Sequence, residues 1–209
     1  MRVRARELWL PALVAGACGA VLMALGMLTP AFSDFELEAE PSLHALREGD
    51  VDGFLTLAPV YGGSLIMRAP FALLPNLWGG GDLALFRSMA VPCLLAAAVF
   101  AVFLWWRGRR LGQSALTCWI ALLIVAGNPL TLRGLEIGHP EELFGAVLCV
   151  AAALAAGARR PLLAGVLLGL ALANKPWAVV AVVPLLAILP DRRPRMLAAA
   201  GSTGLLVML

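Results

Sequence analysis

Apolar runs of about 18 residues or more recur along this chain, and they constrain its fold more than any other feature. Such a run is long enough to cross the hydrocarbon core of a bilayer as a helix. The composition agrees, because 61% of the 209 residues are hydrophobic and only 14% are charged, whereas a typical soluble chain has about 25% charged residues. We therefore expect an integral membrane protein, built as an all-α, polytopic bundle of transmembrane helices.

The first apolar run could be mistaken for a signal peptide, because arginines precede it. It is too long for the apolar region of a signal peptide, and no convincing cleavage site ends it. We therefore interpret residues 8–31 as an uncleaved first span. The four cysteines each lie inside an apolar run and form no CxxC pair, which favours small buried side chains over zinc ligands or disulfides.

Clustered arginines predict the topology. The positive-inside rule places the clusters, and with them the N-terminus, in the cytoplasm. The clusters are Arg2/Arg4/Arg6, Arg107/Arg109/Arg110, Arg159/Arg160 and Arg192/Arg193/Arg195. One span must leave the cytoplasm and another return between neighbouring clusters. The expected spans are residues 8–31, 83–106, 114–132 and 142–158, a short hairpin of 161–174 and 176–190, and an incomplete span, 196–209.

Residues 161–190 are expected to form a hairpin rather than one long helix. A continuous helix would place Lys175 at mid-membrane, at a cost of about 2.5–3.5 kcal/mol, and would move the last arginine cluster outside. Pro176 also disfavours helix in the residue before it. Each arm would be about 21 Å long as a helix, short of the core of about 30 Å. Lys175 is therefore expected at a tip just below the outer surface or in a water-filled cavity.

The segment between the first two spans, residues 33–80, is expected to be an outer loop. Its part 54–78 contains prolines and paired glycines that make a poor spanning helix. We interpret this part as interfacial helices, with Arg68 at headgroup level and Tyr61 and Trp78 as belt residues.

The last expected span, residues 196–209, reaches only about 21 Å as a helix. No polar tail follows it. We therefore expect residues 1–209 to form a single transmembrane domain that is the N-terminal part of a longer membrane protein.

Seven of the 13 acidic residues fall between Asp34 and Asp52, directly after the first span. Four of them alternate over residues 34–40, and they crowd together whether the segment is extended or helical. One of these carboxylates could serve as a general base. Asp34 is the best candidate because the preceding span fixes it at the membrane surface, and Glu36 comes next. The alternative is a solvated acidic loop that marks the translocated side.

His44 lies on a short helix expected between Pro41 and Gly49. Helical spacing would let it pair with Glu48 at i+4. We therefore expect a structural role for this histidine.

A second outer loop brings Arg133, Glu136 and His139 together. Glu141 and Glu142 follow a proline, and favourable helix-start chemistry is sufficient to explain them. Helix-start chemistry does not explain why an arginine, a glutamate and a histidine lie close together in one short loop. These side chains form a second group of candidate site residues.

Lys175 is the most unusual of the candidate residues, because a lysine between two apolar arms indicates a functional site. The alternative is a lysine that extends to the membrane surface. Together with Arg133 and His139 on the outer side, it could receive a phosphate group.

Several of these features together resemble the GT-C superfamily of membrane glycosyltransferases. An acidic motif follows the first span, a long outer loop with interfacial helices comes next, and residues 166–175 (VLLGLALANK) lie in a short hairpin. The chain is most similar to the polyprenyl-phosphate-sugar-dependent group that includes glycosyltransferase family 87. Residues 58–65 and 138–142 resemble actinobacterial membrane proteins of that kind. The chain departs from the pattern in having Asp-x-Glu-x-Glu-x-Glu, where the family often has an Asp-x-Asp-like motif or a lone Asp.

The resemblance implies a GT-C-like bundle in a bacterial plasma membrane. Its members transfer a sugar from a polyprenyl-phosphate carrier to an acceptor hydroxyl on the extracytoplasmic face. Here the sugar would be mannose-like or another hexose or pentose, and the acceptor a lipid or glycan. The net charge of +3 is too small to suggest a nucleic-acid partner.

The resemblance also implies roles for the candidate residues. Asp34, or else Glu36, would take the acceptor's proton as general base. The interfacial helices of residues 54–78 would admit the carrier's lipid tail. A divalent metal held by the acidic loop is compatible with the sequence, which does not require one. The residues implied for phosphate or substrate binding are Lys175, Arg133, His139 and Glu136.

Two other classes of membrane protein fit the span pattern. A transporter would also use broken helices and polar residues near mid-membrane, but transporters commonly place an acid inside a span, and no expected membrane core here contains one. A non-catalytic scaffold is the third possibility. A large outer C-terminal domain in the full-length protein would favour the enzyme, and an internal repeat of the span pattern would favour the transporter.

Overall fold

The computed structural model describes residues 7–26, 28, 33–59 and 62–208. Every element in the described part of the chain is a helix. In chain order they are α1 (Trp9–Gly26), α2 (Ser33–Glu38), α3 (Glu40–Arg47), α4 (Val51–Leu57), α5 (Gly63–Ala72), η2 (Leu74–Leu77), α6 (Asp82–Arg110), α7 (Ala115–Ala126), α8 (Pro129–Glu136), α9 (Glu141–Gly157), α10 (Pro161–Asn174), η3 (Pro176–Ala181), α11 (Val182–Ile188), η4 (Pro190–Arg192) and α12 (Arg193–Met208).

Three stretches of the described chain are long and apolar enough to cross a membrane: Trp9–Gly26, Asp82–Arg110 and Ala115–Glu136. They carry many exposed large apolar side chains, as expected for surfaces that face lipid rather than water. The predicted all-α membrane bundle is therefore confirmed.

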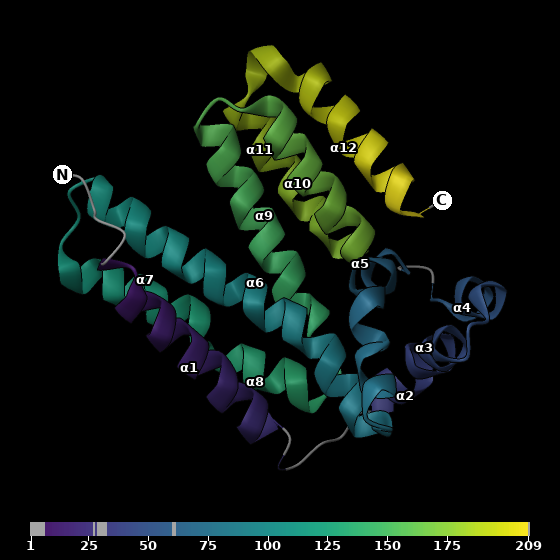
Figure 1. The fold of residues 1–209 in the computed structure, drawn as a ribbon. Helices are drawn as coiled ribbons and strands as arrows, with labels where there is room; N and C mark the ends of the chain where they lie inside the picture. Colours follow the sequence, from purple (N-terminus) through teal and green to yellow (C-terminus); the bar gives the residue numbers. More distant parts are fainter. Residues whose placement is uncertain (1–6, 27, 29–32, 60–61, 209) are drawn as a thin grey trace.

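The helices form two groups that meet beside the short helices of the first loop (Figure 1). In the first group, α1, α6 and α7 pack around Ala101, Trp105 and Leu122. In the second, α9 to α12 pack around a core in which alanines at 152, 156, 164 and 200 let the helices approach closely. A third cluster, which includes Phe86 and Leu135, joins α1, α6 and α8 to α2–α5.

The connections that carry the arginine clusters gather at one end of the bundle. In Figure 1 the α6–α7, α9–α10 and α11–α12 connections lie toward the upper left, whereas α2–α5 and the start of α9 lie toward the lower right. The guanidinium of Arg192 donates to the backbone oxygen of Arg159 at 3.2 Å, which joins two of these connections. The first cluster, Arg2/Arg4/Arg6, lies outside the described residues.

The expected span 114–132 is interrupted. Helix α7 ends at Ala126, and α8 begins after Asn128, whose side chain accepts a hydrogen bond from the Leu130 N–H at 2.9 Å. Pro129 at the first position of α8 suits a helix start. As a result, Arg133 and Glu136 lie on a helix and not in a loop as expected.

The apolar segment around Lys175 also breaks where the proline predicts. Helix α10 ends at Asn174, and Lys175 has an extended backbone with φ −153° and ψ 133°. The second arm differs from the single helix expected, because it begins as the 3₁₀ segment η3 and continues as α11. How deeply these arms lie in a membrane stays a prediction.

Two expectations for the outer loop were wrong. Arg68 is not at the surface, because α5 packs between α6 and α10 and leaves the residue only 4% exposed. His44 contacts Glu40 and Asp82 rather than Glu48, because the i−4 neighbour and the start of α6 face its ring. Trp78 is exposed as a belt residue would be, and Tyr61 lies outside the described residues.

The clustering of arginines at one end predicts opposite accessibility for Glu38 and Arg109. In a cysteine-free background, a cysteine at Glu38 should react with a membrane-impermeant maleimide added outside intact cells. A cysteine at Arg109 should react only after the membrane is opened, because its cluster is expected in the cytoplasm. Labelling of both positions from the same side would contradict this topology.

Candidate functional site

Five polar side chains from separate parts of the chain meet where the two helix groups join the first loop. We call them the Glu141 network: Asp34 on α2, Arg68 on α5, His139 between α8 and α9, Glu141 at the start of α9, and Lys175 between α10 and η3. The network therefore connects distant segments of the sequence, since His139 and Asp34 are 105 positions apart.

Glu141 is the centre of this network. One carboxylate oxygen, Oε1, lies 2.9 Å from His139 Nδ1 and 3.1 Å from Lys175 Nζ. The other, Oε2, accepts from Arg68 Nη2 at 3.3 Å. The side chain is only 8% exposed, and a buried carboxylate needs such partners because desolvation of an unpaired charge is costly.

Arg68 is held in place by its own helix and by α6. Its guanidinium donates to the backbone oxygen and hydroxyl of Ser64, at 3.1 and 2.8 Å, and to the backbone oxygen of Met89 at 3.2 Å. Gly63 lets α5 come this close to α10, because a Cβ there would lie 2.6 Å from the backbone oxygen of Ala173. The absence of a side chain at Gly63 thus helps bring Arg68 to Glu141.

His139 joins the buried carboxylate to a more exposed one. Its Nδ1 faces Glu141, and its Nε2 lies 3.0 Å from Oδ2 of Asp34. The hydrogen bond to Glu141 raises the pKa of His139 above its ordinary value, against the lowering effect of burial, and the charge of Asp34 adds to the rise. An imidazole placed between two carboxylates can donate from both nitrogens only when it is protonated.

A glycine lets α2 reach His139. Gly138 has a φ of 91°, a left-handed conformation that favours glycine. A Cβ at this position would lie 2.9 Å from the backbone nitrogen of Phe35. Gly138 therefore serves both the turn before His139 and the close approach of the residue next to Asp34.

Exposure increases from one end of the network to the other. The side chains of Arg68, Glu141 and Lys175 are 5–8% exposed, that of His139 is 19% exposed, and that of Asp34 is 46% exposed. Asp34 lines a small cleft together with Phe35, Glu38 and Pro59. It is therefore the network carboxylate that a substrate can reach most easily.

Lys175 also contacts a second carboxylate. Its Nζ lies 3.7 Å from Oε1 of Glu142, which is 43% exposed. The indole N–H of Trp177 donates to the other oxygen of Glu142. Asn174 donates to the backbone oxygen of Glu141 at 2.9 Å, so the break after α10 is attached to the start of α9 by side chains on both sides of Lys175.

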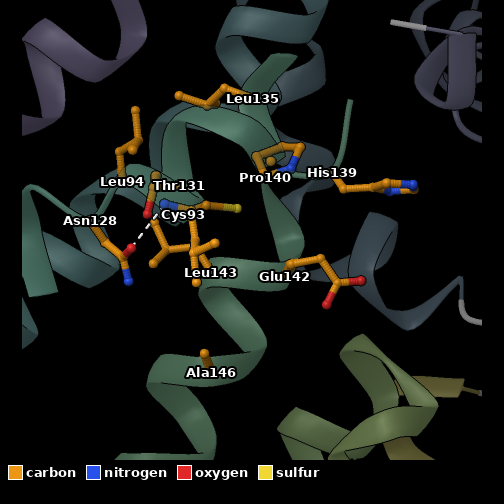
Figure 2. Close-up of a pocket in the computed structure, with 12 residues that line it drawn as sticks. Cys93, Leu94, Asn128, Thr131, Leu135, His139, Pro140, Glu142, Leu143 and Ala146 are labelled. Carbon is orange, nitrogen blue, oxygen red and sulfur yellow. Dashed lines mark hydrogen bonds between the residues drawn. The ribbon is translucent and has the colours of Figure 1, made fainter. Parts of the chain in front are cut away.

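An apolar cavity of about 210 Å³ lies beside the network, between α6, α8 and α9. Figure 2 shows His139 and Glu142 extending to the same side from this pocket, while apolar side chains such as Leu94 and Leu143 line its interior. An apolar space next to polar groups is the arrangement expected for a ligand with an apolar part and a charged part.

The structure brings together three of the residues singled out in the sequence, Asp34, His139 and Lys175. Among the described residues, Arg133 and Glu136 form an ion pair with each other at 3.2 Å. Glu36 lies exposed on α2. The functional roles assigned to all six residues stay predictions.

Sequence reasoning missed the two residues that complete the network. Glu141 was attributed to helix-start chemistry, which its position at the start of α9 satisfies. Arg68 was attributed to the membrane surface. A signal for Arg68 was present, because an arginine within an apolar helix generally faces the bundle interior and finds a partner.

Comparison with protein families matches residues 62–209 to glycosyltransferase family 87. This confirms the resemblance seen in the sequence. Comparisons with curated proteins and with solved structures give no match. The matched range includes Arg68, His139, Glu141 and Lys175, and it begins after Asp34.

The charges around Glu141 predict that its replacement is costly. Glu141→Gln keeps the shape of the side chain but removes the carboxylate charge that faces the buried Arg68 and the nearer of the two carboxylates beside Lys175, so the free energy of unfolding should fall by about 3–5 kcal/mol. The matched control is Glu136→Gln, whose partner Arg133 is 68% exposed and whose loss should cost about 0–1 kcal/mol. Unfolding in a detergent titration measures both changes, and equal losses would contradict a central role for Glu141.

The raised pKa of His139 predicts a pH dependence of stability. A group whose pKa is higher in the folded state stabilises the fold fully below its unfolded pKa, about 6.5, and this stabilisation is lost as pH rises through the folded pKa. The melting temperature of the wild type should therefore exceed that of His139→Gln most at pH 5–6, and the difference should shrink above about pH 6.5. A difference that is constant between pH 5 and 9 would contradict protonation of His139 in the fold.

Proposed function

The chain belongs to glycosyltransferase family 87, and on this basis we propose that it transfers a sugar from a polyprenyl-phosphate carrier to an acceptor hydroxyl on the extracytoplasmic face of the membrane. The family assignment makes the chain a transferase and favours this reaction over the transporter and scaffold alternatives. The donor, the acceptor and the side of the membrane are our proposals. The observation that carries the proposed mechanism is the gradient of exposure along the Glu141 network, which ends at a half-exposed carboxylate.

We assign the general base to Asp34. In the proposed reaction the acceptor oxygen forms a bond to the anomeric carbon, and its proton passes to the Asp34 carboxylate. The bond between the anomeric carbon and the phosphate oxygen breaks, and polyprenyl phosphate leaves with the electron pair. Glu141 is unsuited to this role, because three cationic or imidazole groups already surround it and its side chain is 8% exposed.

His139 is assigned a positioning role for Asp34. Its Nε2 contacts Oδ2 of the carboxylate, and Glu141 fixes the orientation of the ring from the other side. A base held in one orientation accelerates proton transfer more than a mobile one. We assign Oδ1, the second oxygen of Asp34, to the acceptor proton.

Lys175 is assigned to the departing phosphate, whose negative charge increases as the bond to the sugar breaks. A fixed cation at the position where charge develops stabilises the transition state. Among its ion pairs with described residues, the contact with Glu142 is longer than that with Glu141, 3.7 Å against 3.1 Å. We propose that the donor phosphate takes the place of Glu142, which Trp177 can retain, while Glu141 keeps Lys175 in position.

The carrier's lipid tail would enter from the bilayer. The apolar cavity between α6, α8 and α9 (Figure 2) is suited to the first isoprene units, because His139 and Glu142 at its edge keep it next to the polar network. Residues 54–78 remain the proposed entrance. The arginine clusters at the opposite end of the bundle support a site on the extracytoplasmic side.

This mechanism predicts that Asp34→Asn lowers the transfer rate by about 10²–10⁴-fold, the usual contribution of general-base assistance. Asp52→Asn is the matched control, because Asp52 is an exposed acid of the same loop on α4, and its activity should stay close to that of the wild type. The assay uses the full-length protein in membranes with a polyprenyl-phosphate sugar as donor. Equal activity of the two variants would remove Asp34 from the mechanism and direct attention to Glu36.

A further inference from the structure

We propose that Glu40, His44 and Asp82 form a zinc site that joins the first loop to the start of α6. Glu40 and His44 lie one turn apart on α3, and Asp82 is the first residue of α6. One ligand atom from each of the three residues lies within 4.8 Å of the other two. The site is separate from the Glu141 network, and the proposal does not depend on the transferase mechanism.

The position of the imidazole is the first argument for a metal. His44 Nε2 lies 3.1 Å from Oε1 of Glu40 and also 3.1 Å from Oδ1 of Asp82. A ring nitrogen carries at most one hydrogen, so it can make one good hydrogen bond but not two. A single cation between the three atoms satisfies both carboxylates and the nitrogen lone pair at once.

The distances fit coordination by one ion. Zinc binds imidazole nitrogen and carboxylate oxygen at about 2.0–2.2 Å, so neighbouring ligand atoms in a tetrahedral site lie about 3.3–3.6 Å apart. Both distances from Nε2 are 3.1 Å, which is about 0.2 Å below this range. Small side-chain rotations of the two carboxylates would complete the arrangement.

The donor set favours zinc over the hard cations. Magnesium and calcium prefer oxygen ligands alone, whereas imidazole together with carboxylate suits a transition metal such as Zn²⁺. The two carboxylates supply the negative charge that a divalent ion requires. Since the side chain of Asp82 is 63% exposed, water can reach the fourth coordination position.

Independent contacts hold the ligand-bearing segments together. Arg47, at the end of α3, donates to Oδ1 of Asn76 at 2.7 Å and to the backbone oxygen of Gly80 at 2.9 Å. Asn76 donates back to the backbone oxygen of Arg47 at 3.3 Å. These bonds use none of the three ligands, so a variant that lacks a ligand should still fold with α3 beside the start of α6.

Zinc binding tests the proposal directly. The wild-type protein, purified in detergent and stripped with a chelator, should bind about one equivalent of Zn²⁺ by equilibrium dialysis and should melt at a higher temperature with the ion present. His44→Gln and Asp82→Asn should lose both the bound equivalent and the rise in melting temperature. Excess Mg²⁺ should not displace the zinc.

Two control variants separate this site from others. Glu48→Gln should keep the bound zinc, because Glu48 lines the same surface depression but is not one of the three ligands. His139→Gln should also keep it, because that histidine belongs to the Glu141 network. The proposal is overturned if the wild type binds no zinc, if His44→Gln binds as much as the wild type, or if loss occurs only in His139→Gln. In each case Glu40, His44 and Asp82 would form an ordinary ion-pair cluster.

Discussion

The burial of the Glu141 carboxylate is the constraint on which the described arrangement around the site depends. A buried charge without partners would destabilise the fold by several kcal/mol, and the partners of this one come from different elements. Arg68 is supplied by α5, His139 by the turn before α9, and Lys175 by the break after α10. The charge is therefore satisfied only when these elements are assembled together. In a bilayer, where packing of apolar side chains against one another gains little over contact with lipid, such an interaction is well suited to fix how the two helix groups meet.

The same network separates structural charges from accessible ones. The guanidinium of Arg68 donates to Ser64 and Met89 as well as to Glu141, and these hydrogen bonds fix its position. Within the network, Asp34 contacts His139 alone among the described residues, and its side chain is 46% exposed. An active site needs groups that are rigid enough to be positioned and exposed enough to meet a substrate. In the mechanism that we propose, the buried end of the network provides the rigidity, and the His139 imidazole transmits it to the exposed Asp34 carboxylate.

The fold class could be predicted from the sequence because it depends on a local property, the length of the apolar runs. The break at Lys175 was predictable for the same reason, since Pro176 acts on its own neighbour. The network was only partly predictable. Asp34, His139 and Lys175 were unusual in their local sequence, but Glu141 had a sufficient local explanation as a helix-start residue. Arg68 and Glu141 are 73 positions apart in the sequence. The residues around either one give no indication that the two side chains pair. Prolines and glycines near Arg68 suggested a surface segment, whereas Gly63 in fact permits close packing against Ala173.

The family match divides the Glu141 network between a matched and an unmatched part of the chain, a division that neither the sequence pattern nor the geometry indicates. It begins at residue 62 and so includes four members of the Glu141 network, but it excludes Asp34. Contacts that join α2 to the matched part include the one between Asp34 and His139 and the packing of Gly138 against Phe35. Phe35 is itself buried and packs edge-on against Phe86 of α6 with ring centroids 5.0 Å apart. Because Phe35 adjoins Asp34 in the chain, the apolar anchor and the carboxylate cannot move independently. The position of Asp34 over the network is thus set by α6 and Gly138 on one side and by the imidazole on the other, although the residue itself lies outside the matched range.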